Sequence, residues 1–244
     1  MSALLQVDKL GKRFGGFVAL EGIDLAVDAG ERVGLIGPNG SGKSTLVNCI
    51  AGALRNESGT VHFDGKQLDR LPAHRRTRLG LARSFQLPKP FHSMTVAENL
   101  HVPALYTVNA RHGGHLSNAQ IDARVEEVLT QVGLHEKANR RPRDLTQIEM
   151  RKLELARAMT ADPKLLIADE AMAGLSHSEV DDILALLLRL NAHGVTVIMI
   201  EHIMRAVTSF SQRLVVLVAG RKIADGAPEE VVRNPEVVKA YIGE

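Results

Sequence analysis

The stretch "GPNGSGKST", residues 37–45, combines glycines, a lysine and hydroxyl side chains in a spacing that suits phosphate binding. It matches G-x-x-x-x-G-K-[ST] at every fixed position and lies between the strand-like "RVGLI" and the helical "LVNCIAGAL". Glycines allow successive N–H groups to turn towards a β-phosphate, Lys43 would neutralise the β and γ oxygens, and the Ser44 hydroxyl would coordinate Mg²⁺. A glycine-rich turn without a ligand is the alternative. The pattern predicts a nucleotide site that includes Gly37, Pro38, Asn39, Gly40, Ser41, Gly42, Lys43, Ser44 and Thr45.

An acidic pair follows a second apolar run, in "LLIADE". The apolar residues predict a buried strand that would deliver Asp169 to the Mg²⁺ shell and Glu170 to the side from which water attacks. On its own, such a pair is usually part of a solvated loop. Because a phosphate loop precedes it in an α/β chain, we expect the pair to complete the nucleotide site.

A third stretch, "DLTQIEMRKLELARAM" at residues 144–159, has the pattern of a helix with its N-terminal cap. Thr146 and Glu149 are spaced as a capping box, in which each side chain accepts a hydrogen bond from the other residue's N–H. Apolar side chains recur at helical spacing, at Met150, Leu153, Ala156 and Met159. Either the helix end only caps itself or it serves a ligand, and these residues alone leave both possibilities open.

The surrounding elements predict an α/β fold. Short strand-like runs come first, at residues 4–7, 22–27 and 32–37. The second half alternates strand, helix, strand, helix and strand from "KLLIADE" to "RLVVLVAG", which is typical of a parallel, doubly wound sheet. Between them lies a polar stretch with helical spacing, such as "NAQIDARVEEVLTQVGL". We expect a helical sub-domain there, set into the α/β core.

Composition excludes several classes of protein. A net charge of +2, from 30 basic and 28 acidic residues, gives no overall field that would favour nucleic acid, and we expect none as a partner. The basic stretch "RLPAHRRTRLGLAR" has no interleaved aromatics, so we interpret it as a solvated helix face. The single Cys49 cannot form an internal disulfide, and the charged N-terminus does not resemble a signal peptide, which together favour a reducing compartment. Apolar runs such as "VTVIMI" are far shorter than the ~18 residues that cross a bilayer, so a membrane role would need a partner.

With these motifs in order, nearly the whole chain resembles the nucleotide-binding subunits of ABC transporters. "RSFQ" places Gln86 where this family has a glutamine that binds Mg²⁺ and water and lies at the contact with the membrane subunits. "VTVIMIEH" places His202 at the family's switch histidine, and "KRFGG" places Phe14 where the family stacks an aromatic ring on adenine. The resemblance implies one domain over 1–244: a P-loop ABC-type ATPase core of parallel strands flanked by helices, an antiparallel N-terminal strand region, a helical sub-domain at roughly 95–161 and a helical tail at roughly 228–244.

The same resemblance implies a mechanism and partners. Two such subunits close head to tail around two ATP molecules; Glu170 would polarise the attacking water, His202 would hold it and the γ-phosphate, and Lys43 with Mg²⁺ would offset charge on the leaving group. Ser44, Gln86 and Asp169 would be the metal ligands. The subunit would sit peripherally on the cytoplasmic face of a bacterial inner membrane, bound to permease subunits and served indirectly by a periplasmic binding protein.

Longer stretches resemble one branch of the family, the ATPase subunits of bacterial branched-chain amino acid importers. They are "RSFQLPKPFHSMTVAENL", "DEAMAGLSHSEV", "IEHIMRAV" and "GAPEEVVRNPEVVKAYIGE". Urea or amide importers and the lipopolysaccharide-export ATPase are similar too. A soluble ABC-type ATPase, such as one for iron–sulfur assembly, is a further alternative. Because the transported molecule never touches this subunit, the residues themselves do not choose among these branches.

One motif departs from the family. Where the family has Leu-Ser-Gly-Gly-Gln, which binds the γ-phosphate held by the partner subunit, this chain has "LTQIE". Gln147 and Ile148 replace the two glycines, so close approach of a phosphate is obstructed and a positive φ becomes costly. Glu149 adds a negative charge and completes the capping box with Thr146. We therefore expect a helix end that caps itself, weak activity of the chain alone, and a heterodimer with a fully equipped ATPase.

Overall fold

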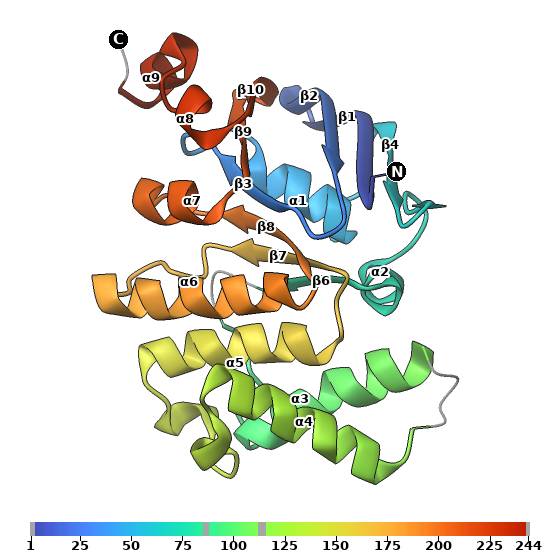
Figure 1. Ribbon diagram of the computed structural model, residues 1–244. Helices are drawn as coiled ribbons and strands as arrows, with labels where there is room; N and C mark the ends of the chain where they lie inside the picture. The colour runs from blue at the N-terminus through green and yellow to red at the C-terminus, as the bar shows by residue number, and fades with distance from the viewer. Residues whose placement is uncertain (1–2, 85–87, 112–115, 243–244) are drawn as a thin grey trace. The chain divides into compact units, whose positions relative to one another are not determined.

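The computed structural model of the chain describes residues 3–84, 88–111 and 116–242. They form two compact units. Unit 1 comprises Met1–Arg76 and Thr196–Glu244, and unit 2 comprises Thr77–Val195. Figure 1 labels most of their helices and strands along the chain.

Unit 1 contains an antiparallel sheet in the order β2-β1-β4-β5 and part of a second sheet in the order β10-β9-β3-β8. In the second, β3 runs parallel to both β8 and β9, while β10 is antiparallel to β9. The elements are β1 (Leu5–Phe14), β2 (Phe17–Val27), β3 (Arg32–Ile36), α1 (Lys43–Ala51), β4 (Ser58–Phe63), β5 (Lys66–Gln67), β8 (Thr196–Ile200), α7 (Met204–Phe210), β9 (Arg213–Val218), β10 (Arg221–Gly226), α8 (Pro228–Val231) and α9 (Pro235–Ile242).

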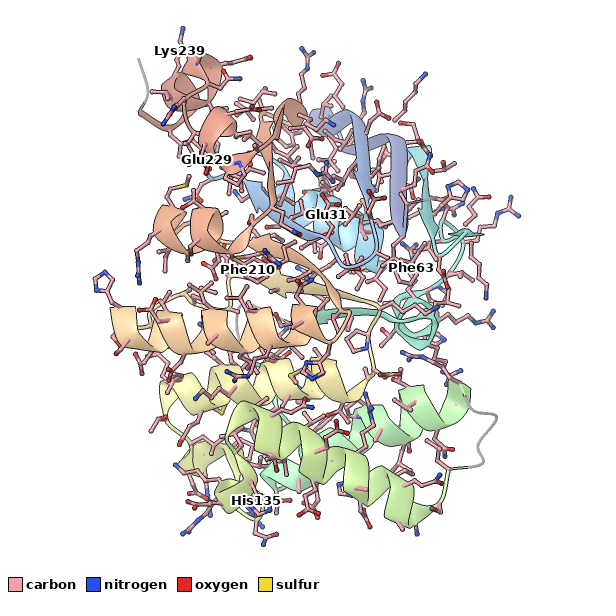
Figure 2. The ribbon with its side chains drawn as sticks, viewed as in Figure 1. Glu31, Phe63, His135, Phe210, Glu229 and Lys239 are labelled. Carbon is pink, nitrogen blue, oxygen red and sulfur yellow. The ribbon has the colours of Figure 1, made fainter. Side chains whose placement is uncertain are left out.

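The core of unit 1 is tightly packed around β3. A Cβ atom added to Gly34 would lie 2.7 Å from a Val207 methyl of α7, so glycine is needed where the helix crosses the strand. Phe63 and Phe210, both labelled in Figure 2, are 0% and 1% exposed. Cys49 is buried in α1, and this burial raises the pKa of its thiol to about 11, so the thiol is neutral at physiological pH.

Unit 2 contains the parallel pair β6 and β7 and most of the remaining helices. Apolar side chains of α4 and α5 are buried, among them Ile121 and Val125 on the first and Leu153 and Ala156 on the second. The elements are β6 (Leu81–Ser84), α3 (Val96–Pro103), the π-helix η1 (Ala104–Asn109), α4 (Asn118–Val132), the 3₁₀ helices η2 (His135–Lys137) and η3 (Pro142–Asp144), α5 (Gln147–Thr160), β7 (Leu165–Asp169) and α6 (His177–Ala192). Helix α2 (Ala73–Leu79) spans the boundary between the units.

The expected fold class is confirmed. The N-terminal strands are antiparallel, parallel strands follow, and the predicted alternation of β7, α6, β8, α7 and β9 is present. The run predicted at residues 4–7 proves to be the start of the longer β1. Helices α3, α4 and α5 lie within the stretch expected to be helical, and the exact domain boundaries stay a prediction.

The basic stretch around α2 differs from expectation at one position. Arg75 is exposed, as expected of a solvated face, but Arg76 is only 2% exposed. Its Nη1 donates to the carbonyls of Cys49 and Ile50, at 2.7 and 2.8 Å, and its Nε donates to the carbonyl of Leu71 at 2.8 Å. The guanidinium thus binds the last carbonyls of α1, which have no partner within the helix. Desolvation lowers the Arg76 pKa, and the opposing charge of Asp69 only partly offsets this.

We expect Arg76→Met to lower the free energy of unfolding by about 3 kcal/mol, because it leaves buried carbonyls without donors. Arg75→Met, one residue away on the exposed face, is the matched control and should change stability by less than about 0.5 kcal/mol. Urea denaturation of both variants measures the difference. Equal stability of the two variants would contradict the role given to Arg76.

Candidate nucleotide-binding site

The phosphate loop joins β3 to α1 and encloses the Lys43 side chain. Lys43 is 6% exposed, and its ammonium donates to the carbonyls of Gly37 at 2.7 Å and Pro38 at 3.0 Å. The Ser41 hydroxyl lies 3.4 Å from the same ammonium. A buried cation is costly unless it is hydrogen bonded, so these acceptors hold the charge at the centre of the loop.

Two glycines have backbone conformations that side chains would obstruct. Gly37 has a φ of 152° and Gly42 has a φ of 104°. A Cβ atom at Gly42 would lie 2.8 Å from the carbonyl oxygen of Ala19, and one at Gly37 would overlap the carbonyl of Leu217. Gly37 and Gly42 are therefore required by the backbone conformation of the loop and by the carbonyls packed against it.

The N-terminus of α1 faces into this loop. Gly42 is the N-cap and contributes no side-chain hydrogen bond, and the first regular helical bond runs from the Leu46 N–H to the Gly42 carbonyl at 2.9 Å. The N–H groups of the first turn and the partial positive charge of the helix end therefore suit an anion. Ser44 is exposed and Thr45 half-buried in that turn.

His202 reaches the same edge of the unit 1 sheet. Strands β3 and β8 are parallel, with Leu35 opposite Ile200. The phosphate loop and His202 both follow these paired positions within two residues, so they extend from the same carboxyl ends, where ligands bind in open α/β sheets. The His202 side chain is exposed, while its neighbour Glu201 is 4% exposed.

Phe14 ends β1 at a hairpin that opens to solvent. Its side chain is 48% exposed, which leaves a ring surface for stacking. The Lys12 ammonium lies 5.3 Å from the ring centroid and 3.0 Å from a Glu57 carboxylate oxygen. This cation–π contact orients the Phe14 ring from one side.

In unit 2, Asp169 ends β7 and is 7% exposed. Its carboxylate forms an ion pair with the Arg83 guanidinium at 2.6 Å, and its N–H lies 3.4 Å from the Ser84 hydroxyl. Glu170 follows at a φ of 47°, a left-handed conformation that is strained for a non-glycine residue. Strain of this kind concentrates at functional sites, which agrees with the place of this pair at a strand end.

Arg83 is a residue that the sequence reasoning missed. It pairs with Ile167 across the parallel strands, so Asp169, two residues further on, lies on the same face of β7. The "RSFQ" stretch contains this arginine, but its partner follows only from the register of β6 and β7. Gln86, predicted from the same stretch, lies outside the described residues.

The capping box at the start of α5 is confirmed. The Glu149 N–H donates to the Thr146 hydroxyl at 3.4 Å, and the Thr146 N–H donates to the Glu149 carboxylate at 2.9 Å. A contact not foreseen adds to it: the Lys137 ammonium lies 2.5 Å from the other carboxylate oxygen. The hydrogen bond from Lys137, followed by those from Thr146, holds the Glu149 pKa below its usual value against the effect of burial.

Gln147, which stands where the family has a glycine, and the nearby Arg151 also have contacts of their own. A Cβ atom at Gly174 would lie 2.8 Å from the Gln147 side-chain nitrogen, so this amide packs against the turn that follows Glu170. Arg151, one helical turn on, donates to the Ala173 carbonyl at 3.1 Å. The start of α5 is therefore attached to the turn beyond the acidic pair.

These features agree with known proteins. Residues 20–173 match the family model "ABC transporter", and residues 221–244 match "Branched-chain amino acid ATP-binding cassette transporter". The high-affinity branched-chain amino acid transport ATP-binding protein BraF of Pseudomonas aeruginosa is 40% identical, covering 99% of this chain and 98% of its own. The probable branched-chain amino acid transport ATP-binding protein LivG of Archaeoglobus fulgidus is 35% identical, covering 98% of this chain and 95% of its own.

Solved structures show the same fold. The ADP conformation of MJ1267, an ATP-binding cassette of an ABC transporter, has a TM-score of 0.88 and 32% identity, and each chain is covered over 100%. A dimeric post-hydrolysis state of the cassette MJ0796, bound to ADP and Pi, has a TM-score of 0.81 and 25% identity over 92% of this chain and 98% of its own.

The chain therefore belongs to the ABC transporter family, as an ATP-binding cassette, the nucleotide-binding ATPase component of such transporters. Within that family, the BraF and LivG relatives named above are branched-chain amino acid transport ATP-binding proteins. Among the described residues, no helix is both long enough and apolar enough to cross a membrane.

The Arg83–Asp169 ion pair leads to a stability prediction. Side-chain exposures of 13% and 10% make the pair largely buried, so Arg83→Met should cost about 3 kcal/mol by leaving an uncompensated carboxylate. Adding Asp169→Asn removes that charge. The double variant should therefore lose less free energy of unfolding than the sum of the losses in the two single variants. Chemical denaturation without nucleotide measures this cycle, with Arg83→Lys as the control that keeps the charge. Additive effects would show that the pair is not coupled.

Proposed function

We propose that this chain binds and hydrolyses ATP to power the import of branched-chain amino acids through membrane partners. The observation that carries the ATPase part is the preformed phosphate loop, with the Lys43 ammonium held 2.7 Å from the Gly37 carbonyl at the N-terminus of α1. The names of its relatives and the match of residues 221–244 support the transported class.

The chain's own groups have distinct roles in this proposal. The N–H groups from Gly40 to Thr45 bind the phosphates, and Lys43 neutralises the β and γ oxygens. Phe14 stacks on the base. Glu170 orients and polarises the attacking water as a general base, and His202 holds this water and the γ-phosphate. These roles need charged groups that are placed before the substrate arrives, which lowers the reorganisation needed in the transition state.

Mg²⁺ fits the donor groups that the motifs supply. Ser44 offers an exposed hydroxyl and Asp169 a carboxylate at a strand end, and Gln86 would add an amide oxygen. Mg²⁺ is a hard cation that is commonly held by one or two protein oxygen ligands together with substrate phosphates. When bound, it would neutralise charge that develops on the phosphate oxygens. Arg83 orients the Asp169 carboxylate from the side of β6.

Two substitutions in the assembled complex test the phosphate loop and the acidic pair. Lys43→Ala should weaken ATP binding, because it removes the charge that meets the β and γ oxygens. Glu170→Gln should bind ATP and fail to turn it over, giving a long-lived closed dimer. Equilibrium titration measures affinity, and phosphate release measures turnover. Normal turnover by Glu170→Gln would remove Glu170 from the role of general base.

The start of α5 favours a heterodimer. In a head-to-tail pair this helix end would face the γ-phosphate bound by the partner subunit, but here the N–H groups of Thr146 and Glu149 already have side-chain acceptors within the chain. Lys137 locks the carboxylate in place, and Gln147 fills the space against Gly174. A partner with a complete signature would give one strong site on this chain's phosphate loop and one weak site facing "LTQIE". Two copies of this chain would have two weak sites.

We further propose that permease subunits hold this heterodimer peripherally at the cytoplasmic face of a bacterial inner membrane, and that a periplasmic binding protein delivers the cargo to those permeases. The names of the relatives as transport proteins support this assembly. The cargo need not touch this chain, so its contribution is the free energy of ATP binding and hydrolysis.

Restoring the signature tests the heterodimer argument. We expect the variant Thr146→Ser, Gln147→Gly, Ile148→Gly, Glu149→Gln to raise the ATPase activity of the isolated chain several-fold, because the two glycines let a phosphate approach the helix end and the neutral glutamine removes a negative charge from its path. Lys43→Ala added to this variant is the control that should abolish the gain. If the wild-type chain alone hydrolyses ATP as fast as the restored variant, the self-capping argument is wrong.

A further inference from the structure

Two aromatic side chains stand opposite one another at the tip of the β1–β2 hairpin. Strand β1 ends at Phe14 and β2 begins at Phe17, with Gly15 and Gly16 between them. The two phenylalanines are paired across the antiparallel ladder. Directly opposed residues project from the same face with Cβ atoms about 5 Å apart, so the tip presents two phenyl groups together.

This pair is the exception among the phenylalanines of unit 1. Phe14 and Phe17 are 48% and 64% exposed, whereas Phe63 and Phe210 are at most 1% exposed. A Cβ atom built at Gly15 or Gly16 would meet nothing within 4 Å. The tip therefore extends away from the described chain, and aromatic area gathered at an exposed tip indicates a binding surface.

The hairpin is attached to the phosphate loop just beyond this tip. Between Val18 and Leu20, β2 has one residue more than β1, and this bulged residue is Ala19, whose carbonyl oxygen lies 2.8 Å from a Cβ atom built at Gly42. Phe17 is two residues before Ala19, or about 7 Å of extended chain. A ligand whose phosphates occupy the loop can thus extend its other end to the tip.

A bridge through Gly220 strengthens this attachment. The Gly220 N–H donates to the Ser41 carbonyl at 3.0 Å, and the Gly220 carbonyl accepts from the Glu21 N–H at 2.8 Å. Strand β2 and the phosphate loop are therefore held together through Gly220, which keeps the aromatic tip at a fixed distance from the loop.

Phe14 alone offers a restricted surface, because Lys12 lies over its ring at 5.3 Å from the centroid. Phe17 is the larger exposed ring of the two and would extend the contact area. The residues of the tip itself are two phenylalanines and two glycines, so the tip has no side-chain donor or acceptor for the edges of a base. Such a surface recognises a flat aromatic ring rather than a particular hydrogen-bonding pattern.

We propose that Phe17 is a second stacking residue for the nucleobase, so that the base of a purine nucleoside triphosphate rests on Phe14 and Phe17 together. This inference rests on the proposed function, in which Phe14 meets the base. It makes recognition tolerant of the base, and adenine and guanine nucleotides bind with similar affinity.

The test uses calorimetric titration of the full chain with Mg-ATP, Mg-GTP and inorganic tripolyphosphate. We expect Phe17→Ala to weaken ATP and GTP binding about tenfold each, because loss of base–aromatic stacking has effects of this size. Tripolyphosphate affinity should not change, since it has no base. Phe17→Leu should lie between wild type and Phe17→Ala, and Phe14→Ala should match Phe17→Ala in direction. Tyr106→Ala, at a 68% exposed aromatic in unit 2, is the matched control and should bind ATP as wild type does.

Unchanged ATP affinity in Phe17→Ala would overturn the proposal. An equal loss of tripolyphosphate affinity would overturn it as well, because the substitution would then act through the phosphate loop. A failure of the proposed nucleotide site is distinguishable from both outcomes, because Lys43→Ala would then leave the affinities for ATP and for tripolyphosphate unchanged.

Discussion

The burial of the Lys43 ammonium is the constraint on which the nucleotide-binding half of this molecule depends. A charge that is 6% exposed must be surrounded by acceptors, and here these are carbonyls of the loop itself. For its carbonyls to turn inward the loop must curl tightly, which requires glycine at Gly37 and Gly42. The curl in turn needs β9 and β2 beside it, since Leu217 of β9 and Ala19 of β2 limit the space. One buried cation thus links loop, sheet and hairpin.

The need of a buried charge for hydrogen-bonding partners also explains the surroundings of Asp169, in the acidic pair. Asp169 is carried to the end of β7 by an apolar strand, and a carboxylate in that position needs a partner. Arg83 provides it from the neighbouring strand, at 2.6 Å, on the face that the parallel register selects. Arg76 behaves in the same way around the end of α1, where buried carbonyls require a donor. In each case a charged side chain is buried because it completes hydrogen bonds that the backbone or a carboxylate would otherwise lack.

The start of α5 shows how a helix end can change its use. Every helix N-terminus has free N–H groups, and either an anion or a capping side chain can satisfy them. Here the side chains of Thr146 and Glu149 satisfy two of these N–H groups from within the chain, and the Lys137 ammonium lies 2.5 Å from the carboxylate. In the function proposed above, this capping stabilises the helix and lowers its affinity for phosphate. An asymmetric pair of ATPase subunits would accommodate this, because in the proposed head-to-tail pair each site would use the loop of one chain and the helix end of the other.

The sequence by itself determined the phosphate loop, the acidic pair, the capping box and the α/β class, because each depends on short-range spacing or on the periodicity of apolar residues. It did not show that Arg76 is buried, that Arg83 meets Asp169, or that Lys137 meets Glu149. Those contacts join residues that are 26, 86 and 12 positions apart, in the case of Arg76 measured to Ile50. Only the pairing of strands and the packing of helices bring such residues together. A charged residue in a sequence is expected to be solvated. Only the tertiary structure decides which charges are buried, because it alone brings the distant partners that offset the free-energy cost of desolvation.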